Sequence, residues 1–244
     1  MAIQITERKY SLVEKIDETP EVLILKFMPE DNLPVEFDPG MFMMITGVDA
    51  QGKRYTARAF SIASDPSTPG MEFMVIKEPK HGEHIGRSHF MDANIGDTFM
   101  LKGPNGQFRF DPKVNRKVLF IAGGTGLAPF ISMLRHIRVT SSQSDVILMY
   151  SVKFPTEIIG KAELEGYKSS LGVDLIVTVT RPQDGDGWSG QTGHVDSAMV
   201  SKYVKDLGER TVYICGPLAF VKAAKDALAA LNVPQQMIKA DVWG

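Results

Sequence analysis

The second half of the chain alternates compact apolar segments with helical ones, and this alternation constrains the fold more than any other feature. Strands are expected at 117–122, 146–150, 173–179, 211–215 and 238–243, with helices at 127–138, about 160–169, 195–204 and 218–231. Strands separated by helices pair in parallel, and both faces of the resulting sheet are covered. The alternation therefore predicts a parallel-sheet, Rossmann-like α/β domain over 113–244.

The first half has a different sequence pattern, with short β-branched, aromatic or Met-rich segments between Pro, Gly and Asp turns. Strands are expected at 9–16, 22–27, 41–47, 57–63, 71–76, 98–101 and 108–110. Close spacing with few helical periods is typical of an antiparallel barrel or sandwich. A polar, proline-containing stretch at 111–116 separates the two sequence patterns, so we predict a β-barrel domain over 1–112.

Composition excludes several classes of function. The 27 Lys and Arg residues against 29 Asp and Glu give a net charge of −2, without runs of like charge, so nothing indicates nucleic-acid or anionic-membrane binding. A single cysteine, Cys215, excludes a disulfide framework and a cysteine-ligated iron–sulfur cluster within this chain. The N-terminus lacks the apolar segment of a signal peptide, which favours the cytoplasm.

A glycine cluster directly follows the first apolar strand of the α/β half. It runs Gly123-Gly124-Thr125-Gly126 and continues to Pro129, which stands where the dinucleotide fingerprint would have a third glycine. Glycines allow a sharp turn and close approach to a diphosphate, and free N–H groups at the following helix attract its charge. The cluster predicts a dinucleotide site, although a plain strand-to-helix turn would have the same composition.

The segment 57–64 reads as a strand with a cation, an aromatic ring and a hydroxyl. Arg58 and Phe60 should face one side, and Ala59 and Ser61 the other. These groups suit diphosphate binding, ring stacking and a hydrogen bond. An exposed arginine beside a core phenylalanine is the alternative explanation.

Taken in order, these motifs resemble the ferredoxin–NADP reductase superfamily of flavin-dependent oxidoreductases. R-A-F-S at 58–61 resembles its R-x-[YF]-S flavin motif, and G-G-T-G-L-A-P at 123–129 resembles its nicotinamide-nucleotide loop. Further matches are Gly103-Pro104-Asn105-Gly106-Gln107-Phe108, Cys215-Gly216-Pro217 and Asp241-Val242-Trp243. The resemblance spans nearly the whole chain, and it implies a bound flavin, FAD rather than FMN, reduced by NAD(P)H.

The resemblance also implies roles in flavin binding. Arg58 would bind the flavin phosphate, Phe60 would pack beside the isoalloxazine ring, and the Ser61 hydroxyl would lie near flavin N5, where hydride arrives. Ala59 and Ile76 are further candidate flavin contacts.

The segment 80–89 occupies the place of the family's second flavin-phosphate motif. Ser88 and a helix around Phe90 match it, but Gly86 stands two residues before Ser88, whereas the family has three. The segment contains three histidines, yet no Cys or carboxylate cluster accompanies them, so we expect no metal.

Three residues near the C-terminus are candidate catalytic groups by the same resemblance. Cys215 would face the nicotinamide, unless it is a small buried core residue. Trp243 would cover the flavin face that the nicotinamide must occupy, or else shield the core. Asp241 would position Ser61 or relay a proton, or be an exposed acid at a strand end.

Coenzyme choice would depend on groups after the second and third strands of the nucleotide domain. Ser151, Lys153 and Arg181 stand there, and the nearest following acid, Glu157, comes seven residues after Tyr150. This favours a 2′-phosphate, and hence NADPH slightly over NADH, unless the two cations are merely solvated.

Two functions from different classes follow from this sequence. The first is a reductase that takes hydride from NAD(P)H onto bound FAD and passes electrons singly to a ferredoxin, a flavodoxin or an oxygenase component. The second is a nucleotide- and flavin-binding electron-transfer subunit of a larger redox assembly.

Overall fold

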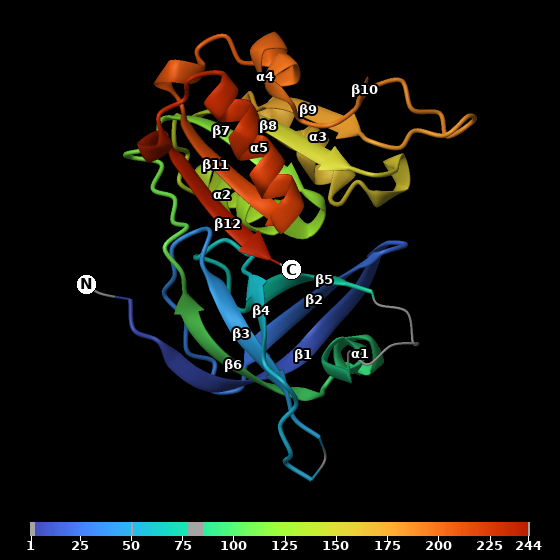
Figure 1. Cartoon of the computed structure of the whole chain (residues 1–244). Coiled ribbons are helices and arrows are strands. Elements are labelled where there is room, and N and C mark those ends of the chain that lie inside the picture. Colours follow the sequence, from blue (N-terminus) through green and yellow to red (C-terminus); the bar gives the residue numbers. More distant parts are fainter. Residues whose placement is uncertain (1–2, 50, 78–84, 244) are drawn as a thin grey trace. The chain divides into compact units, whose positions relative to one another are not determined.

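The computed structural model describes residues 3–49, 51–77 and 85–243 of the chain. These residues form two compact units (Figure 1). The first comprises Met1–Phe110 together with Ile131–His136, and the second comprises Asp111–Phe130 and Ile137–Gly244. The domain limits 1–112 and 113–244 stay a prediction. Among the described residues, no helix is long and apolar enough to cross a membrane.

The first unit is built on an antiparallel sheet of six strands in the order β4-β3-β6-β1-β2-β5. A backbone hydrogen bond of 2.8 Å from Ala63 N to Glu72 O joins the two edges, so the sheet curves into a near-barrel. This confirms the predicted antiparallel β domain. The elements are β1 (Thr6–Thr19), β2 (Val22–Pro29), β3 (Phe42–Gly47), β4 (Arg58–Ser61), β5 (Met71–Ile76), α1 (Ile85–Asp92) and β6 (Thr98–Asn105).

Alternation along these strands turns one face of the sheet into the core of the first unit. On β1, Tyr10 and Leu12 are buried while their neighbours are more exposed. Phe27 of β2 contacts Phe99 of β6 edge to face, with ring centroids 5.0 Å apart. Aromatic pairs of this kind stabilise a core beyond the area they bury.

The second unit has a parallel sheet of six strands in the order β10-β9-β8-β7-β11-β12, as predicted for a Rossmann-like domain. Its strands are β7 (Lys117–Gly123), β8 (Asp145–Val152), β9 (Asp174–Val179), β10 (Gln191–Thr192), β11 (Thr211–Pro217) and β12 (Ile238–Trp243). Its helices are α2 (Ala128–Val139), α3 (Lys161–Leu171), α4 (Ser197–Tyr203) and α5 (Leu218–Ala230), with short 3-10 turns at Gly124–Leu127, Pro155–Glu157, Leu207–Glu209 and Gln235–Met237.

Both faces of the parallel sheet are covered. Leu119 and Ile121 of β7 share one core cluster with residues of α4 and α5, such as Val200 and Leu228. Phe120, which lies between them in the strand, points to the opposite face and stacks on Phe130 of α2 at 4.8 Å. Burial on both faces explains why these strands read as continuous apolar segments.

The strand expected at 108–110 is wrong. These residues form an irregular segment in which Phe108 and Phe110 are buried, and Phe110 N donates to Pro39 O at 3.1 Å. The aromatic side chains here anchor the segment to the core without a sheet ladder. The two-residue strand β10 beside β9 was not expected, because two residues carry no periodicity.

Candidate functional site: strand β4 and the carboxyl edge of the parallel sheet

Strand β4 carries the four residues of the predicted flavin motif. It pairs antiparallel with β3, with Ile45 opposite Arg58 and Phe42 opposite Ser61. Arg58, Phe60 and Ser61 are half-buried, whereas Ala59 is exposed. Strand β4 ends the strand order of the sheet, and Ala63, two residues beyond it, bonds across to β5.

The Arg58 guanidinium carries a buried nitrogen that no described residue satisfies. Its Nε atom is buried and has no hydrogen-bond partner among the described residues. A buried donor on a cation is costly to leave unpaired, so such an atom in a folded protein calls for a partner beyond the described residues. An anionic group, such as a cofactor phosphate, satisfies this requirement.

Helix α1 adds aromatic groups beside β4 that the sequence motif alone did not indicate. Phe60 contacts Phe90 of α1 edge to face at 5.2 Å, and His89 stacks on Tyr55 at 4.0 Å. The His89 Nε2 atom is buried and has no partner within the described part of the chain, and burial lowers the pKa of its imidazole. Tyr55 and His89 are therefore further candidates for cofactor contact.

The segment that follows β4 is held firmly within the first unit by residues of Ile131–His136. Ser132 Oγ donates to Ser64 O at 2.6 Å, and Arg135 bonds to Ala63 O at 3.1 Å. His136 Nδ1 lies 2.9 Å from Asp65 Oδ2. Burial raises the pKa of Asp65, but hydrogen bonds from Ser67 and the contact with His136 outweigh it and leave the pKa below its ordinary value. These bonds fix the backbone just beyond Ser61.

The predicted nucleotide loop lies at the carboxyl end of β7, where open α/β sheets bind ligands. Residues Gly124–Leu127 form a 3-10 turn that leads into α2. Gly124 has φ +54°, and a Cβ atom there would meet open space. A Cβ atom on Gly126 would lie 2.3 Å from the carbonyl oxygen of Cys215, so no side chain fits at that position. The loop therefore lies close against the end of β11 and leaves its outer side open.

Thr125 lies in this 3-10 turn, and Pro129 lies in the first turn of α2. Both candidate residues are therefore at the carboxyl edge of the sheet. Pro129 is tolerated there because the first helical residues need no backbone N–H.

The Cys215-Gly216-Pro217 motif ends β11 and lies beside β12. Cys215 pairs with Asp241, and Pro217 pairs with Trp243. The Cys215 side chain is 0% exposed, and burial raises the pKa of its thiol well above the ordinary value. The thiol is therefore held protonated in the core, which suits a packing residue better than a nucleophile.

Asp241 and Trp243 remain half-buried on β12. Burial raises the pKa of Asp241, against a hydrogen bond from its neighbour's N–H that lowers it. The Trp243 Nε1 atom is buried and has no partner among the described residues. Within the described residues, the carboxyl edge thus also carries an unsatisfied donor. The roles expected for Cys215, Asp241 and Trp243 stay predictions.

The ends of β8 and β9 bring the candidate coenzyme-selecting residues together. Ser151 is buried and pairs with Gly123 of β7, and Lys153 O accepts a 2.9 Å hydrogen bond from Arg181 N. Both cationic side chains are exposed. The turn at Pro155–Glu157 folds Glu157 back, so that its carboxylate accepts from Lys153 N at 3.1 Å. Although Glu157 comes seven residues after Tyr150 in the sequence, its carboxylate therefore lies beside Lys153.

Two of the expected flavin contacts stand elsewhere in the first unit. Ile76 is half-buried at the end of β5, where it pairs with Val22, and Ser88 lies in α1. His81 and His84 of the candidate phosphate segment lie outside the described residues. Within the described part, no group of three or more His, Cys, Asp or Glu residues is arranged to hold a metal.

Comparisons with known proteins assign both halves of the chain. Residues 9–110 match the family model for an oxidoreductase FAD-binding domain, and residues 120–226 match that for an oxidoreductase NAD-binding domain. The glycine betaine monooxygenase reductase subunit of Chromohalobacter salexigens is 30% identical over 219 residues, which cover 88% of this chain and 58% of that protein. The chain thus spans about three fifths of the length of the curated relatives it matches.

Solved structures agree with this assignment. A ferredoxin reductase in carbazole 1,9a-dioxygenase is 25% identical and superposes with a TM-score of 0.85, covering 100% of this chain and 71% of that one. The cytochrome b5 reductase domain of Ulva prolifera nitrate reductase, also 25% identical, has a TM-score of 0.82 and covers 97% of each chain. With an FAD-binding domain on the antiparallel sheet and an NAD-binding domain on the parallel one, the chain belongs to the ferredoxin–NADP reductase superfamily of flavin-dependent oxidoreductases.

Proposed function

We propose that the protein is a reductase that takes hydride from NAD(P)H onto bound FAD and passes electrons singly to a separate protein. The observation that carries this proposal is the unsatisfied Arg58 Nε atom on β4, two residues from Phe60 and three from Ser61. A cation, an apolar ring and a hydroxyl on one edge strand match the phosphate, the isoalloxazine and the reacting end of a flavin. The FAD-binding family match over this strand supports the same assignment.

In this proposal the first unit holds and orients the flavin. Arg58 binds the diphosphate, with α1 and its Ser88 backbone nearby as a second phosphate contact. Phe60 supports the ring system and is itself held by Phe90. Ser61 donates a hydrogen bond at flavin N5. Bound FAD supplies the chemistry that links a two-electron hydride donor to one-electron acceptors.

The second unit binds the nicotinamide nucleotide at the carboxyl edge of its sheet. Backbone N–H groups of the Gly124–Leu127 turn hold the diphosphate, and Gly126 allows the loop to lie against the end of β11. Gly216 and Pro217 line the end of β11, beside Trp243 of β12. Trp243 would control entry of the nicotinamide, and Asp241, whose pKa is raised by burial, would hold a proton at the carboxyl edge.

Lys153 and Arg181 select NADPH modestly over NADH by attracting the 2′-phosphate. The two cations stand at this edge with the Glu157 carboxylate, which accepts a hydrogen bond from Lys153 N. Glu157 therefore reduces the preference but does not reverse it. Ser151 supports the floor of this site from β8.

The electron acceptor is proposed to be an oxygenase component or the small carrier that serves one. The relatives include reductase components of glycine betaine and propane monooxygenases, and a ferredoxin reductase is among the similar structures. With one cysteine, this chain has no means of holding a cysteine-ligated cluster of its own. We keep the cytoplasm, expected from the sequence, as the proposed compartment.

Spectroscopy of the purified protein tests the function directly. We expect a yellow protein whose flavin band bleaches on addition of NADPH, and whose chromophore, released by heat, runs as FAD on chromatography. A colourless protein that takes up neither FAD nor FMN would contradict the proposal. A yellow protein that NADPH and NADH leave unbleached would instead favour a binding subunit without turnover.

Two variants of β4 separate the roles of its residues. Ser61→Ala should retain flavin but slow its reduction in stopped-flow by about 100-fold, the typical cost of losing one polar contact to a reacting centre. Arg58→Ala should mainly lose flavin during dialysis, because the cation is assigned to the diphosphate. Ser169→Ala, on an exposed part of α3, is the matched control. Equal reduction rates for Ser61→Ala and the control would refute the assignment of N5 to Ser61.

A further inference from the structure

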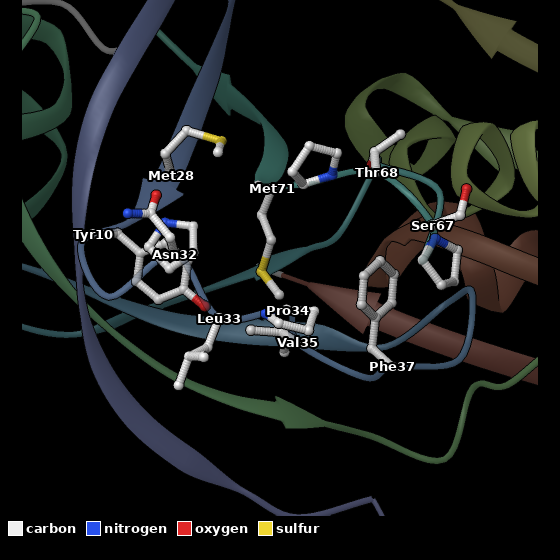
Figure 2. A pocket seen from close by; sticks show the side chains of 14 residues that line it. Tyr10, Met28, Asn32, Leu33, Pro34, Val35, Phe37, Ser67, Thr68 and Met71 are labelled. Carbon is white, nitrogen blue, oxygen red and sulfur yellow. The ribbon is translucent and has the colours of Figure 1, made fainter.

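The first unit contains a cavity that none of the proposed flavin or nucleotide residues lines. Its volume is about 260 Å³, and its walls come from β1, the segment between β2 and β3, and the segment that leads into β5. Figure 2 shows the Tyr10 ring at one side, with its hydroxyl directed toward Leu33, Pro34 and Met71. Apolar side chains form most of the lining. Cavities of this size and character accept small organic molecules.

The Tyr10 hydroxyl is the unsatisfied polar group of this cavity. Tyr10 is 1% exposed, and its hydroxyl oxygen has no hydrogen-bond partner among the described residues. Burial raises the pKa of this phenol, Arg8 lowers it by a smaller amount and Asp31 raises it further, so the hydroxyl stays neutral and able to donate. A buried hydroxyl without a partner costs free energy, and a ligand that accepts its hydrogen bond would recover that cost.

The two other side-chain hydroxyls of the lining, on Ser67 and Thr68, are already engaged. Ser67 Oγ bonds to the Asp65 carboxylate, and Thr68 Oγ1 donates to Asp65 O at 2.7 Å. These hydroxyls therefore do not compete for a ligand. The amide of Asn32, at the exposed rim, remains as an additional polar group.

The charge beside the cavity is neutralised within the protein. Arg8 Nε donates to Asp31 Oδ2 at 2.9 Å, and the same guanidinium bonds to Leu33 O at 2.7 Å and to Pro34 O at 3.3 Å. Because the carboxylate and the guanidinium satisfy each other, neither is free to attract an ion. The same bonds fix the segment over the cavity, so its shape is largely preformed.

We propose that this cavity binds a small, uncharged, mostly apolar molecule with one oxygen that accepts a hydrogen bond from Tyr10. Aromatic or alicyclic ketones represent this class. A carboxylate or an amine would be rejected, because burying an unpaired charge among apolar side chains costs far more than one hydrogen bond returns.

Binding of two probes of matched shape to the FAD-loaded protein tests the proposal. Acetophenone carries the acceptor oxygen, and cumene replaces it with a methyl group. We expect acetophenone to bind more tightly by about 3–10-fold, in titration calorimetry and in saturation-transfer NMR, as one hydrogen bond typically provides. Tyr10→Phe should abolish this difference while leaving cumene binding unchanged. Tyr167→Phe, in α3, is the control for removing a tyrosine hydroxyl elsewhere.

Val35→Phe provides an independent check, because the larger ring fills the cavity from its own lining. Loss of binding for both probes, with flavin content unchanged, would support the assignment. Absence of binding to the wild-type protein would overturn it and leave water as the occupant. Binding that neither Tyr10→Phe nor Val35→Phe alters would also overturn it, since the probe would then sit elsewhere. If Val35→Phe fails to fold, Tyr10→Phe alone decides.

Discussion

The amino and carboxyl edges of the parallel sheet differ in how their cations are paired. Cations at the amino edge bond to carboxylates, whereas Lys153 and Arg181 at the carboxyl edge are exposed. At the amino edge, Arg210 is 4% exposed and bonds to Asp206, to Asp145 and to the backbone oxygen of Val118. Lys117, at the start of β7, pairs with Asp206 and Glu209. Carboxylates of the same unit thus neutralise both Arg210 and Lys117.

The carboxyl edge is left open. The glycine turn after β7 has open space beside Gly124, and Lys153 and Arg181 extend exposed side chains from the strand ends. Charge that the protein does not neutralise is available to a ligand, whereas charge that it neutralises contributes to stability. Substitutions at the amino edge should therefore lower the free energy of unfolding, whereas substitutions at the carboxyl edge should change the KM for the coenzyme.

The largest effect on stability is expected at the amino edge. Arg210→Ala removes a buried cation with several charge-assisted hydrogen bonds, and should lower the free energy of unfolding by about 2–4 kcal/mol. Urea denaturation measures this loss, while the KM for NADPH should stay unchanged. Arg210→Lys keeps the positive charge but not the planar guanidinium, so it should recover part of the lost free energy of unfolding. A change in the KM for NADPH in Arg210→Ala without a loss of stability would contradict the proposed difference between the two edges.

At the carboxyl edge, Gly126→Ala should act on the coenzyme. The added Cβ atom would lie 2.3 Å from Cys215 O, so the turn must shift and its N–H groups with it. We expect the KM for NADPH to rise by about tenfold or more while flavin content is retained, since one misplaced diphosphate contact costs on the order of 1.4 kcal/mol.

Gly166→Ala in α3 is the matched control for this change. A Cβ atom there meets nothing within 4 Å, and alanine favours a helix over glycine by about 1 kcal/mol. The control should therefore stabilise the protein slightly and leave the KM alone. An unchanged KM for both variants would place the diphosphate away from this turn.

Smaller effects are expected from the charges at the ends of β8 and β9. Arg181→Ala should raise the KM for NADPH by about 3–10-fold and leave that for NADH nearly constant, as expected for one exposed phosphate contact. Glu157→Gln should lower the KM for NADPH, because it removes a negative charge beside Lys153. Steady-state kinetics with both coenzymes measures the two effects. Better use of NADH by the wild type would contradict the proposed preference.

The smallest effect is a pH dependence at β12. Burial raises the pKa of Asp241 above its ordinary 3.8, so the unfolded chain releases this proton first. Ionisation then costs stability as the pH rises from about 3.8 to the raised value, and Asp241→Asn avoids that cost. Thermal unfolding should show the variant gaining over wild type across this range. Asp174→Asn, exposed at the start of β9, controls for loss of a carboxylate, and an equal pH-dependent gain there would show that the effect does not come from burial.

Periodicity and turn residues were sufficient to predict the two kinds of sheet. The helices and strands of the second unit agree with the expected ranges to within a few residues, because continuous apolar strands and amphipathic helices differ strongly in pattern. The segment at 108–110 failed because buried aromatic residues occur in irregular segments as well as in strands. Its burial depends on the residues around Pro39, which lie far away in the sequence.

The candidate site was less accessible to sequence reasoning, because it depends on contacts between distant residues. Glu157 was discounted by its distance along the chain, yet a 3-10 turn returns its carboxylate to Lys153. Tyr55 and His89 meet although 34 positions separate them, and no pattern in either segment announces the stack. The unsatisfied nitrogen of Arg58 was likewise visible only once its neighbours were placed.

The first unit is not continuous in the sequence, because it includes Ile131–His136. Arg135 bonds to Glu72, which is 8% exposed, and His136 lies beside Asp65, which is 1% exposed. A ribosome that has completed residue 112 has therefore made the whole antiparallel sheet, with Lys26 beside Glu72 and Ser67 beside Asp65, but has not yet made Arg135 and His136. We therefore expect the flavin domain to gain stability from the first helix of the following domain, so a fragment for expression should end beyond residue 136.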